Sequence, residues 1–439
     1  MEKKNQRSGS SCHLTDYRFQ VGKNSFWTTA FQRAVNEHEI VRIPAGEYLI
    51  DDTIILPSDC QIFAEEGAVI KKAPDMNVLM LRNALTKDGS RMPVINGEKN
   101  RNISITGGVW TEAVDGKNWR CGLYDRDGNF HGVTAGMFFN HVENLSIKNV
   151  TIAKIGGYGI QVSHLTDGCF ENITFDGTAA DGLHINGFSE NIRVKNVKGC
   201  IGDDLVALNA YDWPQSSVAF GPIRNVFCED LEVFEESSYK ALRILPGKYF
   251  YEDGSVSDCS IHDVVFRNVK GIHTCKFYFQ TPCYPIHGER KKGEPGDCGN
   301  IRFENVEITL SEPVDRLPEY MESHPIKGSI AAFELGSNIE KLTFENVKVT
   351  LNREKYPRSY FMCIGPKSVR SGEYEVFDPY ISSTAKEVIL ENVTVNGTAI
   401  EEKNRQEWIH EIIFDDIYQE GDPKTLGKIE KISFKNEKQ

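Results

Sequence analysis

Ile147-Lys148-Asn149-Val150 is the first copy of a short phrase that decides the fold: an apolar residue, a polar residue, Asn, and then Val or Ile. The other copies are Phe170-Glu171-Asn172-Ile173, Val194-Lys195-Asn196-Val197, Phe266-Arg267-Asn268-Val269, Phe303-Glu304-Asn305-Val306, Phe344-Glu345-Asn346-Val347 and Leu390-Glu391-Asn392-Val393. The first copies lie 23 and 24 residues apart, and later spacings are longer. A phrase that returns at such a period indicates a solenoid, in which each repeat stacks on the one before it.

Between these copies, the chain from Asn102 onward consists of short runs of Val, Ile, Phe and Thr separated by Gly, Asn and Asp. Such runs are typical of short β-strands, and propeller repeats are longer than these. The pattern therefore predicts an all-β protein, a right-handed parallel β-helix. The repeated Asn is expected to form a structural ladder, because Asn tolerates left-handed backbone and hydrogen-bonds neighbouring backbone.

The domain prediction is a polar tail over residues 1–20 and a single β-helix domain over 21–439. Phe26 to Glu37 has helical spacing of apolar residues and is expected to form a helix that caps the first coil. Loop insertions are predicted near residues 110–133, 211–221 and 280–299. Insertions in solenoids often wall the binding face.

Composition limits the partners and the compartment. The net charge of −13 argues against nucleic acid and anionic membranes as partners, and no apolar run of about 18 residues predicts a membrane span. The first residues lack the apolar core of a signal peptide, so a cytoplasmic protein is predicted unless a leader has been removed. The eleven scattered cysteines predict reduced core thiols, with no metal site and no cofactor. The sequence predicts no oligomeric state.

Two carboxyl motifs, Asp181-Gly182 and Gly202-Asp203-Asp204, lie about one repeat apart. Residues one repeat apart are stacked neighbours in a solenoid, so these three carboxylates are expected to lie together. Adjacent strand residues point to opposite faces, and a carboxylate in an apolar core is very costly. One aspartate of the pair is therefore expected at a bend after Gly202. By the same alternation, His184 is expected to face outward.

Three clustered carboxylates suit glycoside hydrolysis. One protonated acid donates to the leaving oxygen, and a carboxylate activates water. Like charges close together raise the pKa of one group, which keeps it protonated near neutral pH. Asp-Gly alone is usually a turn, but with Gly-Asp-Asp one repeat later the pair favours a catalytic site.

At these motifs the chain resembles the polygalacturonase-like glycoside hydrolases, a family of pectin-degrading right-handed β-helices. The family carries Asp-Gly on one coil and Gly-Asp-Asp on the next, here Asp181-Gly182 and Gly202-Asp203-Asp204 before the strand Leu205 to Leu208. The entry segment Thr29 to Tyr48 is also similar, and the resemblance extends over most of the chain. It implies inverting hydrolysis, with Asp204 as the acid and with Asp181 and Asp203 holding the water.

The chain departs from the family at three places. Ala179-Ala180 stands where the family has Asn-Thr, the family's Gly-His-Gly has no counterpart, and its Arg-Ile-Lys is kept only in part as Arg243-Ile244-Leu245. The missing positions help the family to bind uronate and to place the acid. Their absence argues against galacturonic acid and leaves room for another sugar in an exo-acting pocket.

Further residues are candidates for binding the sugar. Arg243 could clamp a substrate or pair with Glu235 or Glu236, and Lys276 lies next along the same face. His184 is either a site residue or an exposed strand histidine. Tyr211 and Trp213 could stack on a sugar ring or anchor a loop, and the basic run at 290–292 is expected to be solvated.

The leading interpretation is an inverting, exo-acting hydrolase of a plant-derived oligosaccharide, pectin-type or related. One alternative is a Ca²⁺-dependent polysaccharide lyase of the same fold, which would need an Asp cluster for the metal and an Arg or Lys base. Another alternative is a carbohydrate-binding β-helix without catalysis.

Overall fold

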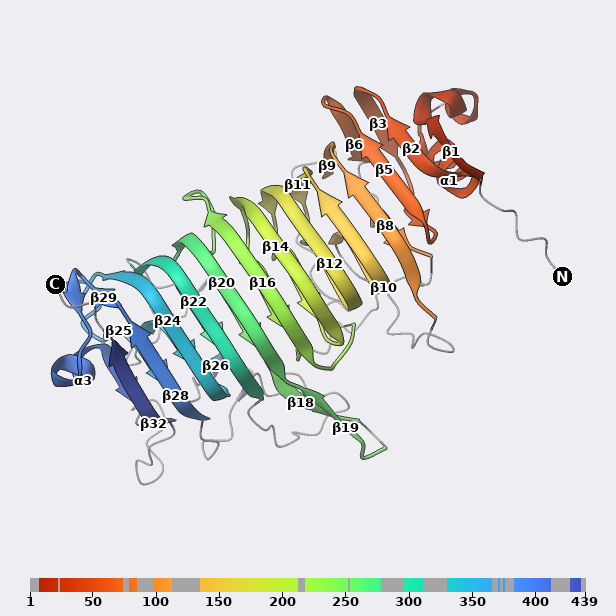
Figure 1. Cartoon of the computed structure of the whole chain (residues 1–439). Coiled ribbons are helices and arrows are strands. Elements are labelled where there is room, and N and C mark those ends of the chain that lie inside the picture. Colours follow the sequence, from red (N-terminus) through yellow and green to blue (C-terminus); the bar gives the residue numbers. More distant parts are fainter. Residues whose placement is uncertain are drawn as a thin grey trace. The chain divides into compact units, whose positions relative to one another are not determined.

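The fold is the right-handed parallel β-helix that the repeats predict. The computed structural model describes residues 8–22, 24–73, 79–84, 98–112, 135–211, 218–251, 253–277, 296–310, 330–364, 370–371, 374–375, 383–411 and 427–435. Arrows in Figure 1 mark the strands of the described residues. The chain divides into two compact units. Unit 1 comprises residues 1–184 and 189–203, and unit 2 comprises residues 185–188 and 204–439. The expectation of a single domain over 21–439 is not tested by this division and stays a prediction.

Unit 1 is built from coils that each contribute strands to three parallel stacks. Its strands are β1 (Ser8–His13), β2 (His38–Ile43), β3 (Gly46–Ile50), β4 (Ile54–Leu56), β5 (Cys60–Ala64), β6 (Ala68–Lys72), β7 (Leu81–Asn83), β8 (Asn100–Thr106), β9 (Val109–Glu112), β10 (Ala135–Lys148), β11 (Thr151–Ile155), β12 (Tyr158–Thr178) and β14 (Ser189–Cys200), with β13 (Leu183–Asn186) beginning in unit 1 and ending in unit 2. One stack runs β2, β5, β8, β10, β12, β14; a second runs β3, β6, β9, β11; and a third runs β4, β7, β10. Stacking buries the apolar face of every strand.

The N-terminal segment differs from the expected tail. Over residues 8–20 it forms β1, which pairs in parallel with β2, and the 3₁₀ helix η1 (Leu14–Gln20), whose Leu14 and Tyr17 are buried. These apolar contacts make residues 8–20 part of the packed structure. The expected helix is present as α1 (Thr28–Glu37), and the amide of its Gln32 exchanges hydrogen bonds with the backbone of Ile55. Its role as a cap stays a prediction.

Unit 2 continues the same strand pattern. Its strands are β15 (Asp204–Asn209), β16 (Ile223–Val233), β17 (Ala241–Leu245), β18 (Gly247–Phe250), β19 (Val256–Cys259), β20 (Ile261–Ile272), β21 (Thr274–Phe277), β22 (Asp297–Leu310), β23 (Ile330–Leu335), β24 (Asn338–Leu351), β25 (Ser359–Ile364), β26 (Arg370–Ser371), β27 (Tyr374–Glu375), β28 (Ser383–Glu391), β29 (Thr394–Val395), β30 (Thr398–Ala399), β31 (Ile409–Glu411) and β32 (Gly427–Lys435), with a short 3₁₀ helix η4 (Glu402–Asn404) and helix α3 (Arg405–Trp408). One parallel stack runs β16, β20, β22, β24, β28, β32, and another runs β15, β17, β21, β23, β25, β31.

The repeated phrase sets the register in both units. In unit 2 its first residue stacks Phe266 on Phe303 on Phe344, with ring centroids 5.3 and 5.6 Å apart and nearly parallel planes. All three rings are fully buried. In unit 1 the equivalent pairs are Ile147 with Phe170 and Phe170 with Val194. The apolar residues at the first position of the phrase therefore stack from coil to coil and form part of the core.

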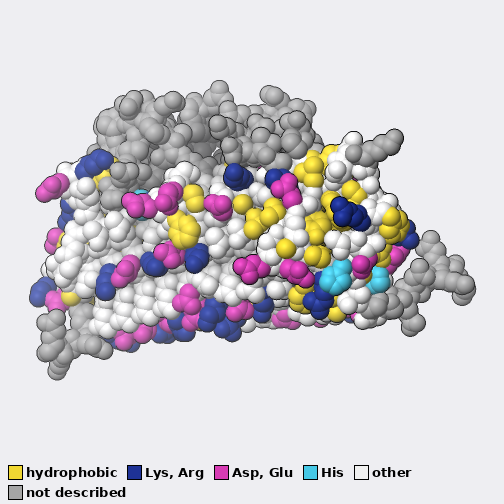
Figure 2. Space-filling model, turned by 90° about the horizontal axis from the view of Figure 1, so that it is seen from above, with side chains coloured by type: hydrophobic (Ala, Val, Ile, Leu, Met, Phe, Trp, Pro, Cys, Tyr) yellow, Lys and Arg dark blue, Asp and Glu magenta, His cyan; other side chains and the backbone are white. Residues whose placement is uncertain are grey.

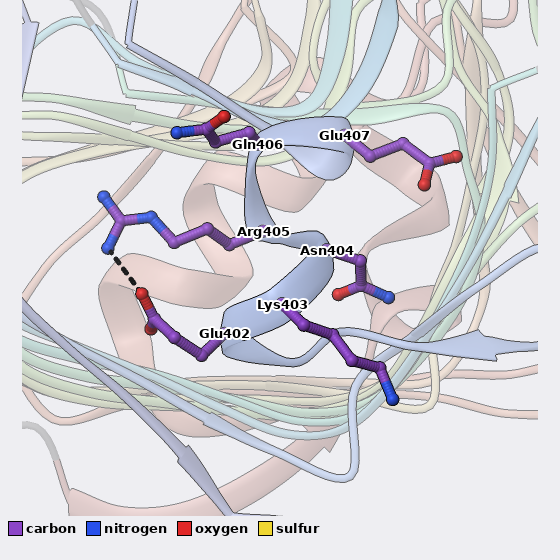
Figure 3. A pocket seen from close by; sticks show the side chains of 6 residues that line it. All are labelled: Glu402, Lys403, Asn404, Arg405, Gln406 and Glu407. Atoms are coloured by element: carbon purple, nitrogen blue, oxygen red, sulfur yellow. Dashed lines mark ion pairs between the residues drawn. The ribbon is translucent and has the colours of Figure 1, made fainter.

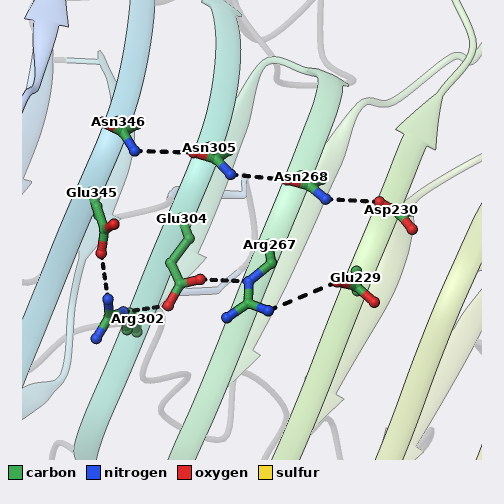
Figure 4. A network of polar contacts seen from close by, with 9 residues as sticks. All are labelled: Glu229, Asp230, Arg267, Asn268, Arg302, Glu304, Asn305, Glu345 and Asn346. Atoms are coloured by element: carbon green, nitrogen blue, oxygen red, sulfur yellow. Dashed lines mark hydrogen bonds and ion pairs between the residues drawn. The ribbon is translucent and has the colours of Figure 1, made fainter.

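The repeated asparagines form the ladders that the sequence predicts. All seven have positive φ, between 50° and 56°. In unit 1 the side-chain amide of Asn172 donates to Asn149 and that of Asn196 donates to Asn172, each at 2.8 Å. In unit 2 the ladder runs from Asp230 through Asn268, Asn305 and Asn346 to Asn392 (Figure 4). Beside it, Arg267 and Arg302 bridge the carboxylates of neighbouring strands.

Several remaining expectations are settled for the described residues. Trp110 lies buried in β9 rather than in a loop, whereas most of the insertions expected near 110–133, 211–221 and 280–299 lie outside the described residues. Every described cysteine is free, as predicted, and most are buried. In the described parts of the chain, no helix is long and apolar enough to cross a membrane.

Candidate active site

Asp181 lies directly before β13 in unit 1 and is almost fully buried. Its carboxylate Oδ2 lies 2.6 Å from Nδ1 of His184, which is also buried. The ring of Tyr158 packs against the His184 ring at 4.1 Å. The alternative of an exposed strand histidine is wrong, because His184 is about 1% exposed. It is a buried partner that orients a carboxylate.

Asp203 lies at the bend that the sequence predicts after Gly202. The backbone N–H groups of Gly202 and Asp203 both approach the carbonyl oxygen of Ala180 at 3.3 Å, which fixes the turn against the preceding coil. A Cβ on Gly202 would lie 2.4 Å from the carbonyl oxygen of Ala179, so only glycine fits there. The bend leaves Asp203 half-buried rather than enclosed.

The carboxylates of Asp181 and Asp203, both in unit 1, each offer an oxygen within 4.8 Å of the other. Stacking of consecutive coils thus brings together two acids that are 22 residues apart in the sequence, as expected. Asp204 follows Asp203 directly and begins β15, the first strand of unit 2. Covalent geometry alone keeps the two neighbouring Cα atoms about 3.8 Å apart.

Asp204 is tied to Arg243 within unit 2. Asp204 is about 1% exposed, and its Oδ2 lies 2.6 Å from Nε of Arg243 on β17. The contact is an ion pair rather than an aligned hydrogen bond. The pairing of β15 with β17 is irregular between Asp204 and Ala207, a bulge of the kind that often re-aims a side chain near a site. The sequence offered Glu235 or Glu236 as the partner of Arg243, and the pair with Asp204 was missed.

The buried thiol of Cys275 is affected by the charge of Asp204. It lies on β21 beside Leu242 of β17 and is fully buried. Burial raises the pKa of the Cys275 thiol well above its usual value, and the negative charge of Asp204 raises it further. The thiol therefore stays protonated and inert.

The other predicted binding residues differ in exposure. Lys276, the register neighbour of Arg243, is about 3% exposed, and its ammonium lies 5.2 Å from the centre of the Tyr239 ring. Tyr211 is buried against Phe220 and Tyr249, which fits a loop anchor. Trp213 lies outside the described residues, as does the basic run at 290–292.

Sequence reasoning missed Glu334. It is the register partner of Lys276 on β23 and is about 7% exposed. The signal was available in Ala331-Ala332-Phe333-Glu334-Leu335, where a single carboxylate interrupts an apolar strand. A buried acid at such a position requires a nearby cation.

A depression elsewhere in unit 2 does not have the features of a site. It is lined by six consecutive residues, 402–407, whose side chains spread apart (Figure 3). Glu402 and Arg405 pair at 3.6 Å, and the remaining side chains do not converge on a common point. The space-filling view shows acidic and basic side chains interspersed over the described surface (Figure 2).

Comparison with known proteins leaves the family open. No family model and no curated protein matches the chain. Among solved structures it is similar to a family 28 exopolygalacturonase from Yersinia enterocolitica, with 13% identity, a TM-score of 0.47, and coverage of 97% of this chain and 78% of that one. It is similar to the A-module of the mannuronan C-5 epimerase AlgE4 from Azotobacter vinelandii, with 12% identity, a TM-score of 0.46, and coverage of 89% and 96%. A third is the surface adhesin PfbA of Streptococcus pneumoniae, with 12% identity, a TM-score of 0.43, and coverage of 88% of each chain. Likenesses this distant decide neither activity nor substrate.

Proposed function

We propose that this protein is a carbohydrate-active β-helix that hydrolyses glycosidic bonds, acting from the chain end on a plant-derived oligosaccharide, pectin-type or related. The observation that supports this most is the set of acids: Asp181 and Asp203 offer oxygens within 4.8 Å of each other, and Asp204 is the next residue. Hydrolysis of a glycoside needs one carboxylic acid and one carboxylate beside the scissile bond. His184 and Arg243 hold the two buried members in place.

The surroundings of the three aspartates suggest their roles. The Arg243 guanidinium next to Asp204 favours the ionised carboxylate, because an opposite charge at this distance stabilises the charged form. We therefore assign Asp204 to water activation. Asp203 lies beside the Asp181 carboxylate within unit 1, and a like charge so close favours retention of a proton, so we assign Asp203 as the acid. This reverses the roles of Asp203 and Asp204 that the family resemblance implies.

Resemblance and geometry disagree on the stereochemical course. The resemblance implies inversion, for which carboxyl groups are commonly about 6.5–9.5 Å apart, whereas retaining enzymes space them at about 5–5.5 Å. An oxygen of Asp181 and an oxygen of Asp203 lie within 4.8 Å of each other, which is below the inverting range. We keep inversion as the proposal, because we assign Asp204 to water activation rather than to nucleophilic attack. Proton NMR of fresh product tests it: the opposite anomer supports water attack, and retention assigns a nucleophile to the cluster instead.

The acid assignment has its own experiment. Asp203→Asn should abolish cleavage of natural oligosaccharides but keep much of the cleavage of nitrophenyl glycosides, whose leaving group needs no proton. Asp204→Asn should abolish both reactions, because activation of water is still required. Equal losses on both substrates in Asp203→Asn would remove it as the acid. Release of monosaccharide from the outset supports exo action, whereas internal fragments contradict it.

The acid cluster also gives the lyase alternative one observation in its favour. Clustered carboxylates are oxygen ligands of the kind that Ca²⁺ prefers. A lyase would lose activity in chelator, regain it with Ca²⁺, and release an unsaturated product that absorbs ultraviolet light. The hydrolase proposal predicts full activity in chelator and no such absorbance. Binding without any released sugar would instead indicate a non-catalytic β-helix.

A further inference from the structure

Within the proposed function, on which this inference rests, we propose that the substrate is a neutral saccharide rather than a uronic acid. The basis is a row of charged residues in unit 2 that begins at Asp204 and continues through Arg243 and Lys276 to Glu334. A site for uronate needs a cation whose charge is available to the sugar carboxylate. In this row each cation lies next to a carboxylate of the protein.

The first cation is Arg243. Its Nε lies 2.6 Å from Asp204, and the side chain is about 15% exposed. An anion that approached Arg243 would therefore also approach the Asp204 carboxylate. The attraction of one charge and the repulsion of the other would largely cancel. The hydroxyl groups of a neutral sugar can instead donate to Asp204 and accept from Arg243.

The second cation is Lys276, which is directly paired in the sheet with Glu334. Paired residues on neighbouring parallel strands lie on the same face, about 4.8 Å apart. Both side chains are buried, and the ring of Tyr239 packs against the Lys276 ammonium at 5.2 Å. The ammonium of Lys276 thus lies over an aromatic face, a carboxylate residue is its direct neighbour in the sheet, and little of Lys276 reaches solvent.

Within this row, therefore, no positive charge is left over to attract an anionic sugar. In this row of unit 2, two cations stand beside two carboxylates. In unit 1, His184 pairs with Asp181, and Asp203 offers an oxygen within 4.8 Å of Asp181, so the acids of this cluster are not outnumbered either. A uronate would bring a further negative charge to these groups, whereas a neutral sugar meets mixed donors and acceptors. The basic run at 290–292 lies outside the described residues, so the experiment must also detect a contribution from it.

The test uses oligosaccharides in matched pairs of the same length and linkage, which differ only at C6, with hydroxymethyl in one member and carboxylate in the other. Turnover is measured by kcat/KM and binding by calorimetry on the full chain. We expect the neutral member of a pair to be preferred by about tenfold or more, the scale expected for an uncompensated like charge near the site. Equal or better use of the uronate member overturns the inference while leaving the hydrolase proposal intact. If nothing is cleaved, calorimetry still decides: preference for neutral sugars supports the inference while the hydrolase proposal fails, and binding to neither member overturns the inference.

Variants of Glu334 and Lys276 test whether these residues cause the preference for neutral sugars. Glu334→Gln leaves Lys276 without its carboxylate, so the neutral-to-uronate preference should fall by about tenfold. The matched control is Glu387→Gln, which removes a carboxylate from an exposed pair with Lys431 in the same unit and should leave the preference unchanged. If Glu334→Gln does not fold, the double variant Lys276→Gln with Glu334→Gln keeps the row neutral and should retain the preference of the wild type. A double variant that switches to uronate would overturn the inference.

Discussion

Two rows of polar residues in unit 2 follow the coils in different ways. The exposed row from Asp230 to Asn392 has the same chemistry on every coil, because each Asn side-chain amide donates to the row residue of the preceding coil at 2.8–3.1 Å. The buried row changes residue type on every coil, through Arg243, Lys276 and Glu334 to Cys363 and His410. A residue repeated at one register position satisfies the backbone of the coil. A residue that occurs once at its position has no such explanation, and this is where chemistry is expected.

The sharpest test replaces a carboxylate with an amide at two positions. One position carries a residue that occurs once, and the other belongs to the repeated ladder. Asp203→Asn should reduce kcat by about 10³-fold or more on natural oligosaccharides, because the proposed acid is lost. Asp230→Asn is the matched control: it keeps an acceptor for Asn268 and restores the ladder residue, so turnover should stay within about twofold of wild type. Initial rates and thermal melting of both variants check this. Similar losses of activity in both variants would show that Asp203 matters no more to turnover than a repeated ladder position does.

The second test compares a buried ion pair with an exposed one. Arg243→Met leaves the Asp204 carboxylate buried without its cation, which should cost about 3–5 kcal/mol of the free energy of unfolding. Lys348→Met breaks an exposed pair with Glu307 in the same unit and should cost less than about 1 kcal/mol. Urea unfolding at equal m-value measures both. If Arg243→Met were as stable as wild type, Asp204 would not depend on it for burial.

The sequence predicts the architecture well because the repeat carries it. The Asn phrase fixes period, register and ladder at once, and Gly202 predicts the bend that separates Asp203 from Asp204. Partners on neighbouring strands that are separated by long stretches of sequence could not be predicted, because the number of residues between paired strands varies. Glu334 lies 58 residues after Lys276, and only the strand pairing brings them together. The prediction of a polar tail over residues 1–20 is wrong over 8–20, because the many polar residues there outnumber those that pack inward, Leu14 and Tyr17 among them.

The ladder itself can be tested at Asn305. Asn305→Ala removes hydrogen bonds to Asn268 and Asn346 and puts a Cβ residue without a local polar partner at φ 54°, so it should destabilise by about 2 kcal/mol. Asn305→Gly loses the hydrogen bonds but tolerates the backbone, so it should cost roughly half as much. Glu307→Ala, exposed on the same strand, is the control and should change little. Equal costs for Ala and Gly would show that backbone conformation is not the reason for Asn.

The smallest expected effect concerns a pair of histidines in unit 1 at positive φ, the conformation that Asn adopts on other coils. His141 and His164 stack with ring centroids 3.8 Å apart, and their φ angles are 57° and 47°. Burial, and to a smaller extent the positive charge of Lys99, lowers the pKa of His141 to about 4. Burial lowers the pKa of His164 to about 3, with His141 and Lys99 adding to the shift.

Because both pKa values are lower in the folded state than in the unfolded chain, the fold favours neutral rings. Their contribution to stability is complete above about pH 6.5 and is lost as the pH falls toward the folded values, since only the unfolded chain binds the protons. Both rings are partly exposed, so the expected loss is only about 1 kcal/mol between pH 7 and 5. His164→Asn places the common ladder residue there and should flatten this dependence in urea titrations. An unchanged slope would assign the acid sensitivity to other groups and leave the histidine pair as packing alone.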